Sequence, residues 1–201
     1  MFTGIIESMG ILEDVVENGT NRSFRISSPI SQELKIDQSL SHNGICLTVE
    51  NIADGRHHVT AVAETLAKTN AGLWKKGNII NLERAMTMNT RLDGHMVQGH
   101  VDTVANCTEI INMDGSWKIG FNFPQQFSAL MIEKGSVCVN GISLTAFEVT
   151  DTSFSVAIIP YTWDHTNLQD IGVGDRVNIE FDMIGKYIQR HISLAQLNTG
   201  K

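Results

Sequence analysis

The feature that most limits how this chain can fold is an internal repeat. Residues 43–48, Asn-Gly-Ile-Cys-Leu-Thr, return at 140–145 as Asn-Gly-Ile-Ser-Leu-Thr, at an offset of 97 residues. The same offset pairs Thr65 with Thr162, and further matches follow in the same order. Ordered matches spread over both halves predict two copies of one domain. We therefore expect domains at 1–87 and 88–184, and a C-terminal segment at 185–201.

Each copy has the residue pattern of a β-domain. Asn18-Gly19, Asp54-Gly55 and Asp114-Gly115 lie between apolar runs rich in β-branched residues. Such pairs tolerate the positive φ angles of tight hairpins, and β-branched side chains suit pleated strands. Many short strands joined by such turns predict an all-β barrel or sandwich.

Three stretches have a helical pattern: 64–70, 124–133 and 183–197. In the last of these, Ile184, Ile188, Ile192 and Ala195 form one apolar stripe along a helix face. This stripe indicates either a helix packed on its own domain or a helix that meets its copies in an oligomer. Periodicity alone leaves both open.

Composition excludes several classes of protein. The net charge of −7 and the pI of about 5.4 argue against a broad phosphate-binding surface, so no nucleic-acid partner is expected. No apolar run approaches the roughly 20 residues of a membrane span, and no signal peptide is visible. Cys46, Cys107 and Cys138 have no paired spacing, so neither a disulfide scaffold nor a metal site is expected. Free thiols without an export signal suggest the cytoplasm.

A few side chains could carry chemistry. The repeat sets Cys46 against Ser143, and a reactive side chain that changes inside a matched motif suggests two similar pockets with different tasks. Residues 94–100, Gly-His-Met-Val-Gln-Gly-His, offer His95 and His100 as acids or bases, although either could be an ordinary surface or core histidine. Lys134 could end a helix ahead of a glycine cap, and Asp182 could begin the C-terminal helix. The residues alone thus predict two related small-molecule pockets.

Four motifs together resemble the riboflavin synthase family, α-chain type. They are Met-Phe-Thr-Gly-Ile-Ile-Glu at 1–7, the paired hexapeptides, Gly-His-Met-Val-Gln-Gly-His-Val-Asp at 94–102, and Val-Asn-Ile-Glu-Phe-Asp at 177–182. The resemblance implies two tandem six-stranded Greek-key β-barrels and a C-terminal α-helix. It also implies a homotrimer whose active site lies between the N-terminal barrel of one subunit and the C-terminal barrel of its neighbour. An association with lumazine synthase is left open.

The activity that this resemblance implies is a transferase reaction without a cofactor. Two molecules of 6,7-dimethyl-8-ribityllumazine exchange a four-carbon unit, giving riboflavin and 5-amino-6-ribitylamino-2,4(1H,3H)-pyrimidinedione. Two identical substrates explain two similar pockets, and the substrate ring itself can act as the electron sink.

The resemblance also implies residue roles. Catalytic positions fall at Ser39, Cys46 and His100 on the side of the N-terminal barrel, and at Lys134, Ser143 and Asp182 on the side of the C-terminal barrel. The remaining substrate-binding positions are Phe2, Thr3, Gly4, Ile5, Ile6, Leu47, Thr48, Thr60, Ala61, Val62, Ala63, Glu64, Thr65, Gly99, Val101, Leu144, Thr145, Ala157, Ile158, Ile159, Pro160, Tyr161 and Thr162.

The main alternative is a binding protein. The lumazine and flavin fluorescent proteins of luminous bacteria resemble this family, hold a lumazine or flavin, and are not catalysts. They depart from the family at the six catalytic positions, all of which this chain keeps. A flavin-binding reductase barrel would need a nicotinamide domain, for which two barrels leave no room. One departure is His42, where many relatives carry an apolar residue.

Overall fold

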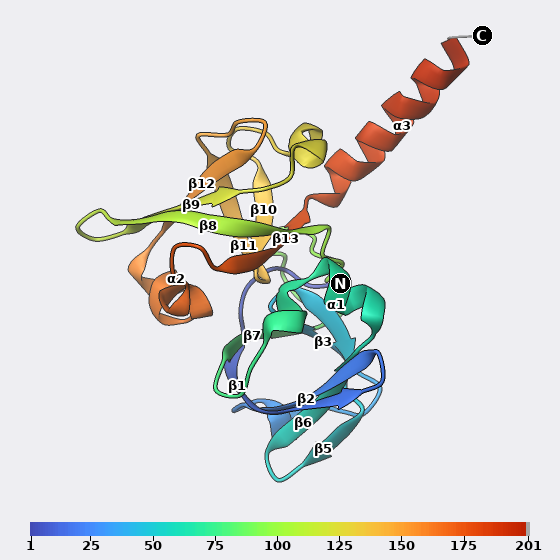
Figure 1. Ribbon diagram of the computed structural model, residues 1–201, viewed down its shortest axis with the longest axis vertical. Helices are drawn as coiled ribbons and strands as arrows, with labels where there is room; N and C mark the ends of the chain where they lie inside the picture. The colour runs from blue at the N-terminus through green and yellow to red at the C-terminus, as the bar shows by residue number, and fades with distance from the viewer. Residues whose placement is uncertain (200–201) are drawn as a thin grey trace.

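The computed structural model describes residues 1–199 and consists of two β-units followed by a helix (Figure 1). The first unit contains β1 (Ser8–Asn18), β2 (Asn21–Ser27), β3 (Ser39–His42), β4 (Ile45–Thr48), β5 (Asn51–Ala53), β6 (Arg56–Ala61) and β7 (Ile79–Arg84). The second contains β8 (Thr103–Asn112), β9 (Trp117–Asn122), β10 (Ser136–Val139), β11 (Ile142–Phe147), β12 (Ser153–Ile158) and β13 (Arg176–Phe181). The all-β fold, its duplication and the C-terminal helix are confirmed.

The two units close differently. The second is a closed six-stranded barrel with the strand order β10-β11-β12-β9-β8-β13. The first was also expected to have six strands, but it has seven, in the open order β4-β3-β7-β1-β2-β6-β5. The strand that matches β11 is broken between β4 and β5, and at the break the Glu50 N–H donates to the His58 carbonyl oxygen (2.9 Å). This bond keeps the chain next to β6 at the break, but no continuous ladder of hydrogen bonds closes the sheet there.

The three hairpin predictions are confirmed. The turns at Gly19, at Asp54-Gly55 and at Asp114-Gly115 all have positive φ angles, from 52° to 120°. These turns join β1 to β2, β5 to β6, and β8 to β9. Asparagine, aspartate and glycine are the residues that reach this region at least cost.

The short helices differ from the expectation in part. The stretch 64–70 becomes α1 (Ala63–Lys68) followed by the 3-10 turn η2 (Asn70–Leu73). The stretch 124–133 is not an α-helix but the 3-10 helix η3 (Gln125–Leu130), because the chain must already be extended at Met131 to enter β10. Two further turns, η1 (Ser31–Glu33) and η4 (Asn167–Asp170), complete the units.

The helix α2 (Pro160–Asp164) was missed, although a proline at its first position is a recognised start signal.

The glycine cap expected at Gly135 is also wrong. The positive φ lies one residue earlier, at Lys134 (62°), as it does at Asp37 (66°), its counterpart in the first copy.

The C-terminal helix α3 (Met183–Thr199) projects away from both units (Figure 1). The Asp182 carboxylate accepts a hydrogen bond from the Ile184 N–H (2.9 Å), so this residue caps the helix as expected. The predicted segment 185–201 is covered as far as 199, and residues 200–201 lie outside the described residues. Among residues 1–199, no helix is long and apolar enough to cross a membrane.

The two units meet on an approximate twofold axis marked by matched asparagines. The side chain of Asn43 accepts from the backbone N–H of Asn81 (2.7 Å), and that of Asn140 accepts from the N–H of Asn178 (2.8 Å). The Asn81 amide then donates to the Asn140 carbonyl (3.0 Å), and the Asn178 amide donates to the Asn43 carbonyl (2.9 Å). These buried bonds cross between the copies and fix their relative orientation.

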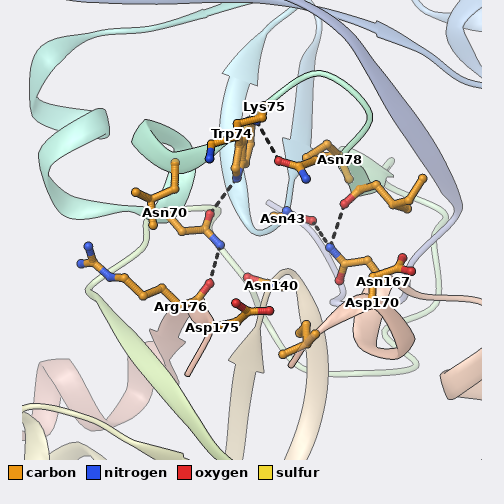
Figure 2. Close-up of a pocket in the computed structure, with 14 residues that line it drawn as sticks. Asn43, Asn70, Trp74, Lys75, Asn78, Asn140, Asn167, Asp170, Asp175 and Arg176 are labelled. Carbon is orange, nitrogen blue, oxygen red and sulfur yellow. Dashed lines mark hydrogen bonds between the residues drawn. The ribbon is translucent and has the colours of Figure 1, made fainter. Parts of the chain in front are cut away.

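A polar cavity of about 300 Å³ lies beside this axis (Figure 2). On one side the Asn70 amide donates to the Arg176 carbonyl (2.9 Å), and the Asn70 carbonyl oxygen accepts from the Trp74 indole (2.9 Å). On the other side the Asn167 amide donates to the Asn43 side chain (3.0 Å). The amides that line the cavity therefore bond to other residues of the interface between the two units. Nothing in their hydrogen bonding calls for a ligand to explain the cavity.

The core of the first unit contains a buried polar chain. His42 contacts the Leu40 carbonyl through Nδ1 (3.1 Å) and the Nε2 of His57 through its own Nε2 (2.9 Å). The Nδ1 of His57 contacts the Ser31 hydroxyl (2.9 Å), which contacts Ser28 (2.8 Å). Because a carbonyl only accepts, the His42 proton lies on Nδ1, so His57 donates from Nε2 and Ser31 donates to His57. The chain is complete only while both imidazoles are neutral.

This arrangement predicts acid sensitivity. Burial lowers the pKa of His57 from 6.5 to about 4, with a smaller contribution from His58, and burial and His57 lower the pKa of His42 well below 6.5. The unfolded chain takes up these protons below pH 6.5 and the folded one does not, so stability falls as the pH drops from 6.5 towards 4. For His57 alone we expect a loss of about 2 kcal/mol between pH 7 and pH 5 in urea unfolding.

The second copy supplies the control for this experiment. Val139 and Phe154, both buried, stand where the first copy has His42 and His57. The double variant His42→Val/His57→Phe should lose less stability over the same pH range than the parent protein. An identical loss in both proteins would contradict the assignment.

Candidate functional site

The first predicted pocket is a cavity of about 230 Å³ beside β4. Along β4 the side chains of Ile45 and Leu47 enter the core, so Cys46 and Thr48 lie on the outer face. Ser39 pairs with Thr48 across β3 and β4 and therefore shares that face. The cavity brings together the predicted residues Cys46, Glu64, Thr65, Gly99, His100 and Val101, with Ile45, Lys68 and Thr69.

Each site is made by a strand of one copy and the segment that precedes the other copy. The Cys46 N–H donates to the Gly99 carbonyl (2.9 Å), and the Ser143 N–H donates to the Gly4 carbonyl (2.7 Å). A Cβ added at Gly99 or at Gly4 would stand 2.6 Å from the Cβ of its partner, and both φ angles are positive. Only glycine allows the segments to approach the strands this closely.

Two buried carboxylates hold these segments. Glu83 accepts from the Thr3 N–H (2.6 Å), the Thr3 hydroxyl (2.6 Å) and the Gly4 N–H (3.0 Å). Glu180, its counterpart, accepts from the backbone N–H groups of Gln98 (2.7 Å), Gly99 (2.9 Å) and His100 (2.8 Å). Burial raises the pKa of both carboxyls, and these hydrogen bonds oppose the rise. The repeat offset of 97 residues matches these two carboxylates, but the sequence alone gives neither of them a role.

Several predicted substrate-binding residues point into the protein. Phe2 pairs with Val97 through two backbone hydrogen bonds, and its side chain is fully buried. The side chains of Leu47, Ala61 and Ile158 are buried in the two cores. These four positions could therefore contact a ligand only through backbone atoms. By contrast Ile5, Val62, Ile159 and Tyr161 are exposed.

The predicted threonines take different roles. The Thr60 hydroxyl donates to Glu50 (2.9 Å) and contacts Ser23 (2.9 Å) on the outer face of the sheet. The Thr65 and Thr162 carbonyls accept from the hydroxyls four residues later, which closes the short helices α1 and α2. Their own hydroxyls have no partner among residues 1–199 and are free to bind a ligand.

The second site centres on Ser143, whose hydroxyl contacts the Nδ1 of His95 (2.7 Å). His95 is buried, and burial lowers its pKa while the charge of Asp182 opposes this. Its Nε2 is buried with no partner among the described residues. The sequence offered His95 as a possible acid or base or as an ordinary histidine, and no local signal reveals its contact with Ser143, because the two residues are 48 apart.

Lys134 and Asp182 belong to the same unit as Ser143. The ammonium of Lys134 lies 5.1 Å from the centre of the Phe147 ring, and Asp182 lines a groove between η3 and α3. The cavity beside Cys46 is not lined by Ser143. In one chain the six predicted catalytic residues therefore fall into two groups. Ser39, Cys46 and His100 lie around β4, where Cys46 and His100 share a cavity, and Lys134, Ser143 and Asp182 belong to the second unit.

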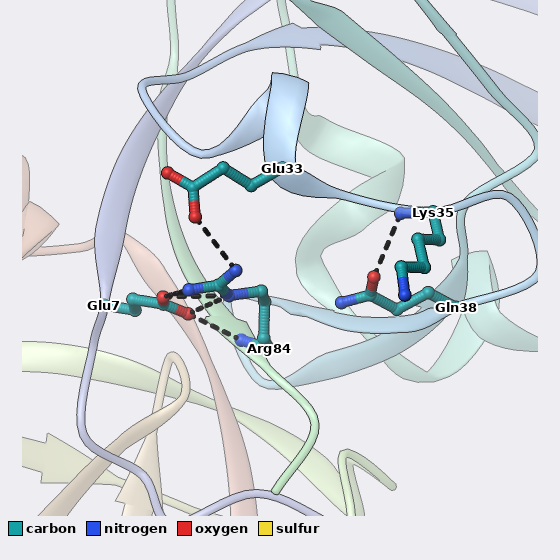
Figure 3. A network of polar contacts seen from close by, with 5 residues as sticks. All are labelled: Glu7, Glu33, Lys35, Gln38 and Arg84. Atoms are coloured by element: carbon teal, nitrogen blue, oxygen red, sulfur yellow. Dashed lines mark hydrogen bonds and ion pairs between the residues drawn. The ribbon is translucent and has the colours of Figure 1, made fainter. Parts of the chain in front are cut away.

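A larger cavity of about 760 Å³ lies between the N-terminal segment and the linker after β7. Arg84 lines this cavity and forms ion pairs with Glu7 and with Glu33 (3.1 Å) (Figure 3). Nearby, the backbone N–H of Lys35 donates to the Gln38 side chain (3.0 Å). The predicted residues Thr3, Ile5 and Ile6 line this cavity.

Across residues 1–199 no group of three or more side chains is arranged to hold a metal ion.

Known proteins match this arrangement over nearly the whole chain. The lumazine binding domain family matches twice, at residues 3–85 and 98–182. The riboflavin synthase of Schizosaccharomyces pombe is 40% identical over 198 residues, covering 94% of this chain and 93% of the relative. That of Bacillus subtilis is 37% identical over 199 residues, covering 98% and 93%. This chain belongs to the riboflavin synthase family.

Solved structures share the family fold. LumP in complex with 6,7-dimethyl-8-(1'-D-ribityl) lumazine matches with a TM-score of 0.83, and its complex with riboflavin matches with 0.85. Each is 22% identical and covers 90% of this chain and 99% of LumP. At this identity the likeness concerns the fold alone, which is the pair of β-units.

Proposed function

We propose that the protein is a riboflavin synthase. It converts two molecules of 6,7-dimethyl-8-ribityllumazine into riboflavin and 5-amino-6-ribitylamino-2,4(1H,3H)-pyrimidinedione. The observation that carries this proposal is the pair of matched sites, at Cys46 and Ser143, in a chain that covers its riboflavin synthase relatives almost completely. The direct test is to mix the protein with this lumazine and follow riboflavin absorbance.

The reaction needs a base near the C7 methyl group of one lumazine and a nucleophile or water at C7 of the other. His100 is exposed in the first cavity, beside Cys46, and can carry the proton. Ser39 and Cys46 serve as nucleophile or hydrogen-bond partners on the same face. Holding the two lumazines in register contributes much of the acceleration, since well-oriented reactants gain about 7–11 kcal/mol.

The two groups of catalytic residues meet in a homotrimer, where the first unit of one subunit faces the second unit of its neighbour. The apolar stripe of α3 supports this proposal, because Ile184, Ile188 and Ile192 are 63%, 55% and 51% exposed. With Leu130 and Ile132 they line an apolar groove of about 670 Å³. Helices from neighbouring subunits would cover this surface, which favours the oligomer over a helix packed on its own domain.

We expect Ile188→Lys to convert the trimer into monomers and to remove most of the activity. A lysine in the middle of the stripe would have to bury its charge against apolar side chains. Light scattering after size exclusion should show the mass falling to about that of one 22.2 kDa chain. Leu194→Lys makes the same change outside the groove and should stay trimeric. An active Ile188→Lys monomer would contradict a site shared between subunits.

Two further proposals rest on the family resemblance. A lumazine synthase would be the natural supplier of the substrate and a candidate for physical association. A cytoplasmic location fits the three free cysteines, Cys46, Cys107 and Cys138.

A further inference from the structure

The contact between His95 and Ser143 is part of a tightly built corner of the second site. The His95 N–H donates to the Thr3 carbonyl (3.1 Å), which ties this segment to the N-terminal segment ahead of β1. A Cβ added at Gly94 would stand 2.1 Å from the Thr3 carbonyl oxygen and 2.8 Å from the Ser143 Cβ. The imidazole therefore reaches Ser143 from a backbone that has little room to shift, whereas Ser143 itself is half-buried and can touch a ligand.

The surroundings of the imidazole indicate where its proton lies. His95 is 8% exposed, and its Nε2 is buried without a partner among residues 1–199. A neutral imidazole carries its hydrogen on one nitrogen only. A buried N–H without an acceptor costs more than a bare ring nitrogen without a donor, and truly orphaned N–H groups are rare. The hydrogen is therefore placed on Nδ1, where it is donated to the Ser143 oxygen (2.7 Å).

We infer that His95 is a positioning residue that makes Ser143 a hydrogen-bond donor to the bound lumazine rather than a nucleophile. With one lone pair of its oxygen engaged by the Nδ1–H of His95, the Ser143 hydroxyl keeps its own proton for another acceptor. The acceptor is a carbonyl oxygen or a ring nitrogen of the pyrimidinedione part of the substrate. This inference rests on the proposed function and deepens it.

The inference also gives the repeat a chemical meaning. At the matched position the first site has Cys46, and no imidazole is hydrogen-bonded to its thiol among the described residues. A hydroxyl fixed as a donor polarises the ring beside it, whereas a thiol can act as a nucleophile once it loses its proton. Two identical lumazines would thus be held in one electron-withdrawing pocket and one reactive pocket. The reaction needs such a difference between them.

The test compares the turnover of single and double variants of His95 and Ser143. In His95→Asn the side-chain amide can occupy the place of the Nδ1–H, so turnover should stay within about threefold of the parent protein. In His95→Ala this donor is lost, and kcat should fall about tenfold, the effect of one neutral hydrogen bond. In the Ser143→Ala background, His95→Ala should change kcat by less than about twofold, because the two residues act as one unit. His58→Asn, at a half-buried histidine outside both sites, controls for the substitution itself.

A second readout separates this role from general-base catalysis. If His95 only positions Ser143, the acidic limb of the pH profile of kcat belongs to another group. The His95→Asn variant, whose side chain cannot titrate, should then keep the acidic limb of the parent protein. If His95 were a base, His95→Asn would be as slow as His95→Ala and that limb would disappear, which would overturn the inference. Additive losses in the double variant would also overturn it. Lumazine binding, followed by fluorescence, and thermal melting should be unchanged in His95→Asn. A parent protein that binds lumazine without converting it would instead refute the proposed function.

Discussion

Replacing His100 by alanine should lower the turnover number by about 10²–10⁴-fold, the range that a positioned proton carrier contributes. The structure allows a clean test, because the His100 backbone is held by Glu180 while its side chain is exposed in the cavity beside Cys46. Alanine therefore removes the imidazole and leaves the loop in place, so the melting temperature should be almost unchanged. The measurement is the rate of riboflavin formation at saturating lumazine.

Cys46→Ser provides the comparison within the same pocket. A hydroxyl retains a polar group at this position, so we expect a lower rate without complete loss. His58→Ala, outside the cavity, should behave like the parent protein. If purified His100→Ala formed riboflavin at the parental rate, its assignment as proton carrier would be wrong.

The largest loss of stability is expected for Gly44→Ala. A Cβ at this position would stand 2.8 Å from the backbone nitrogen of Gly141, on the axis where the two units meet. Backbone atoms on both sides cannot move without breaking the asparagine network described above. Adding the cost of a positive φ to the cost of overpacking, we expect a loss of about 3 kcal/mol or more in urea unfolding.

A matched control separates the two costs. Gly19 also has a positive φ angle (61°), but nothing lies within 4 Å of a Cβ added there. Gly19→Ala should therefore lose only the conformational part, about 1–2 kcal/mol. Gly141→Ala should resemble Gly44→Ala, because its added Cβ would meet the Gly44 nitrogen at 2.8 Å. Equal losses at Gly19 and Gly44 would contradict the close packing of the two units.

Sequence reasoning reached the fold through features that act locally or repeat. Asp-Gly and Asn-Gly pairs specify hairpins by themselves, and the matched hexapeptides placed Cys46 and Ser143 in equivalent sites. The capping role of Asp182 was also predictable, since a cap depends on residues that are neighbours in the chain.

What sequence reasoning missed depends on contacts between distant segments. The pairs His95–Ser143 and His42–His57 join residues 48 and 15 apart, and each histidine has an ordinary local context. The extra strand β5 arises from a break in a ladder, which periodicity does not reveal. Gly135 has the residue type of a cap, but this turn is hydrogen-bonded to Ala146 of β11, and its positive φ lies at Lys134. Contacts between distant segments determine these features, and the conformational preferences of the local sequence do not.

The most direct test of the whole account is a product analysis. The protein, without added cofactor or metal, is mixed with 6,7-dimethyl-8-ribityllumazine, and both products are quantified by chromatography over several turnovers. The account predicts one riboflavin and one 5-amino-6-ribitylamino-2,4(1H,3H)-pyrimidinedione for every two lumazines consumed. Lumazine that is bound in a fixed ratio and recovered unchanged would contradict it, and would identify the chain as a binding protein.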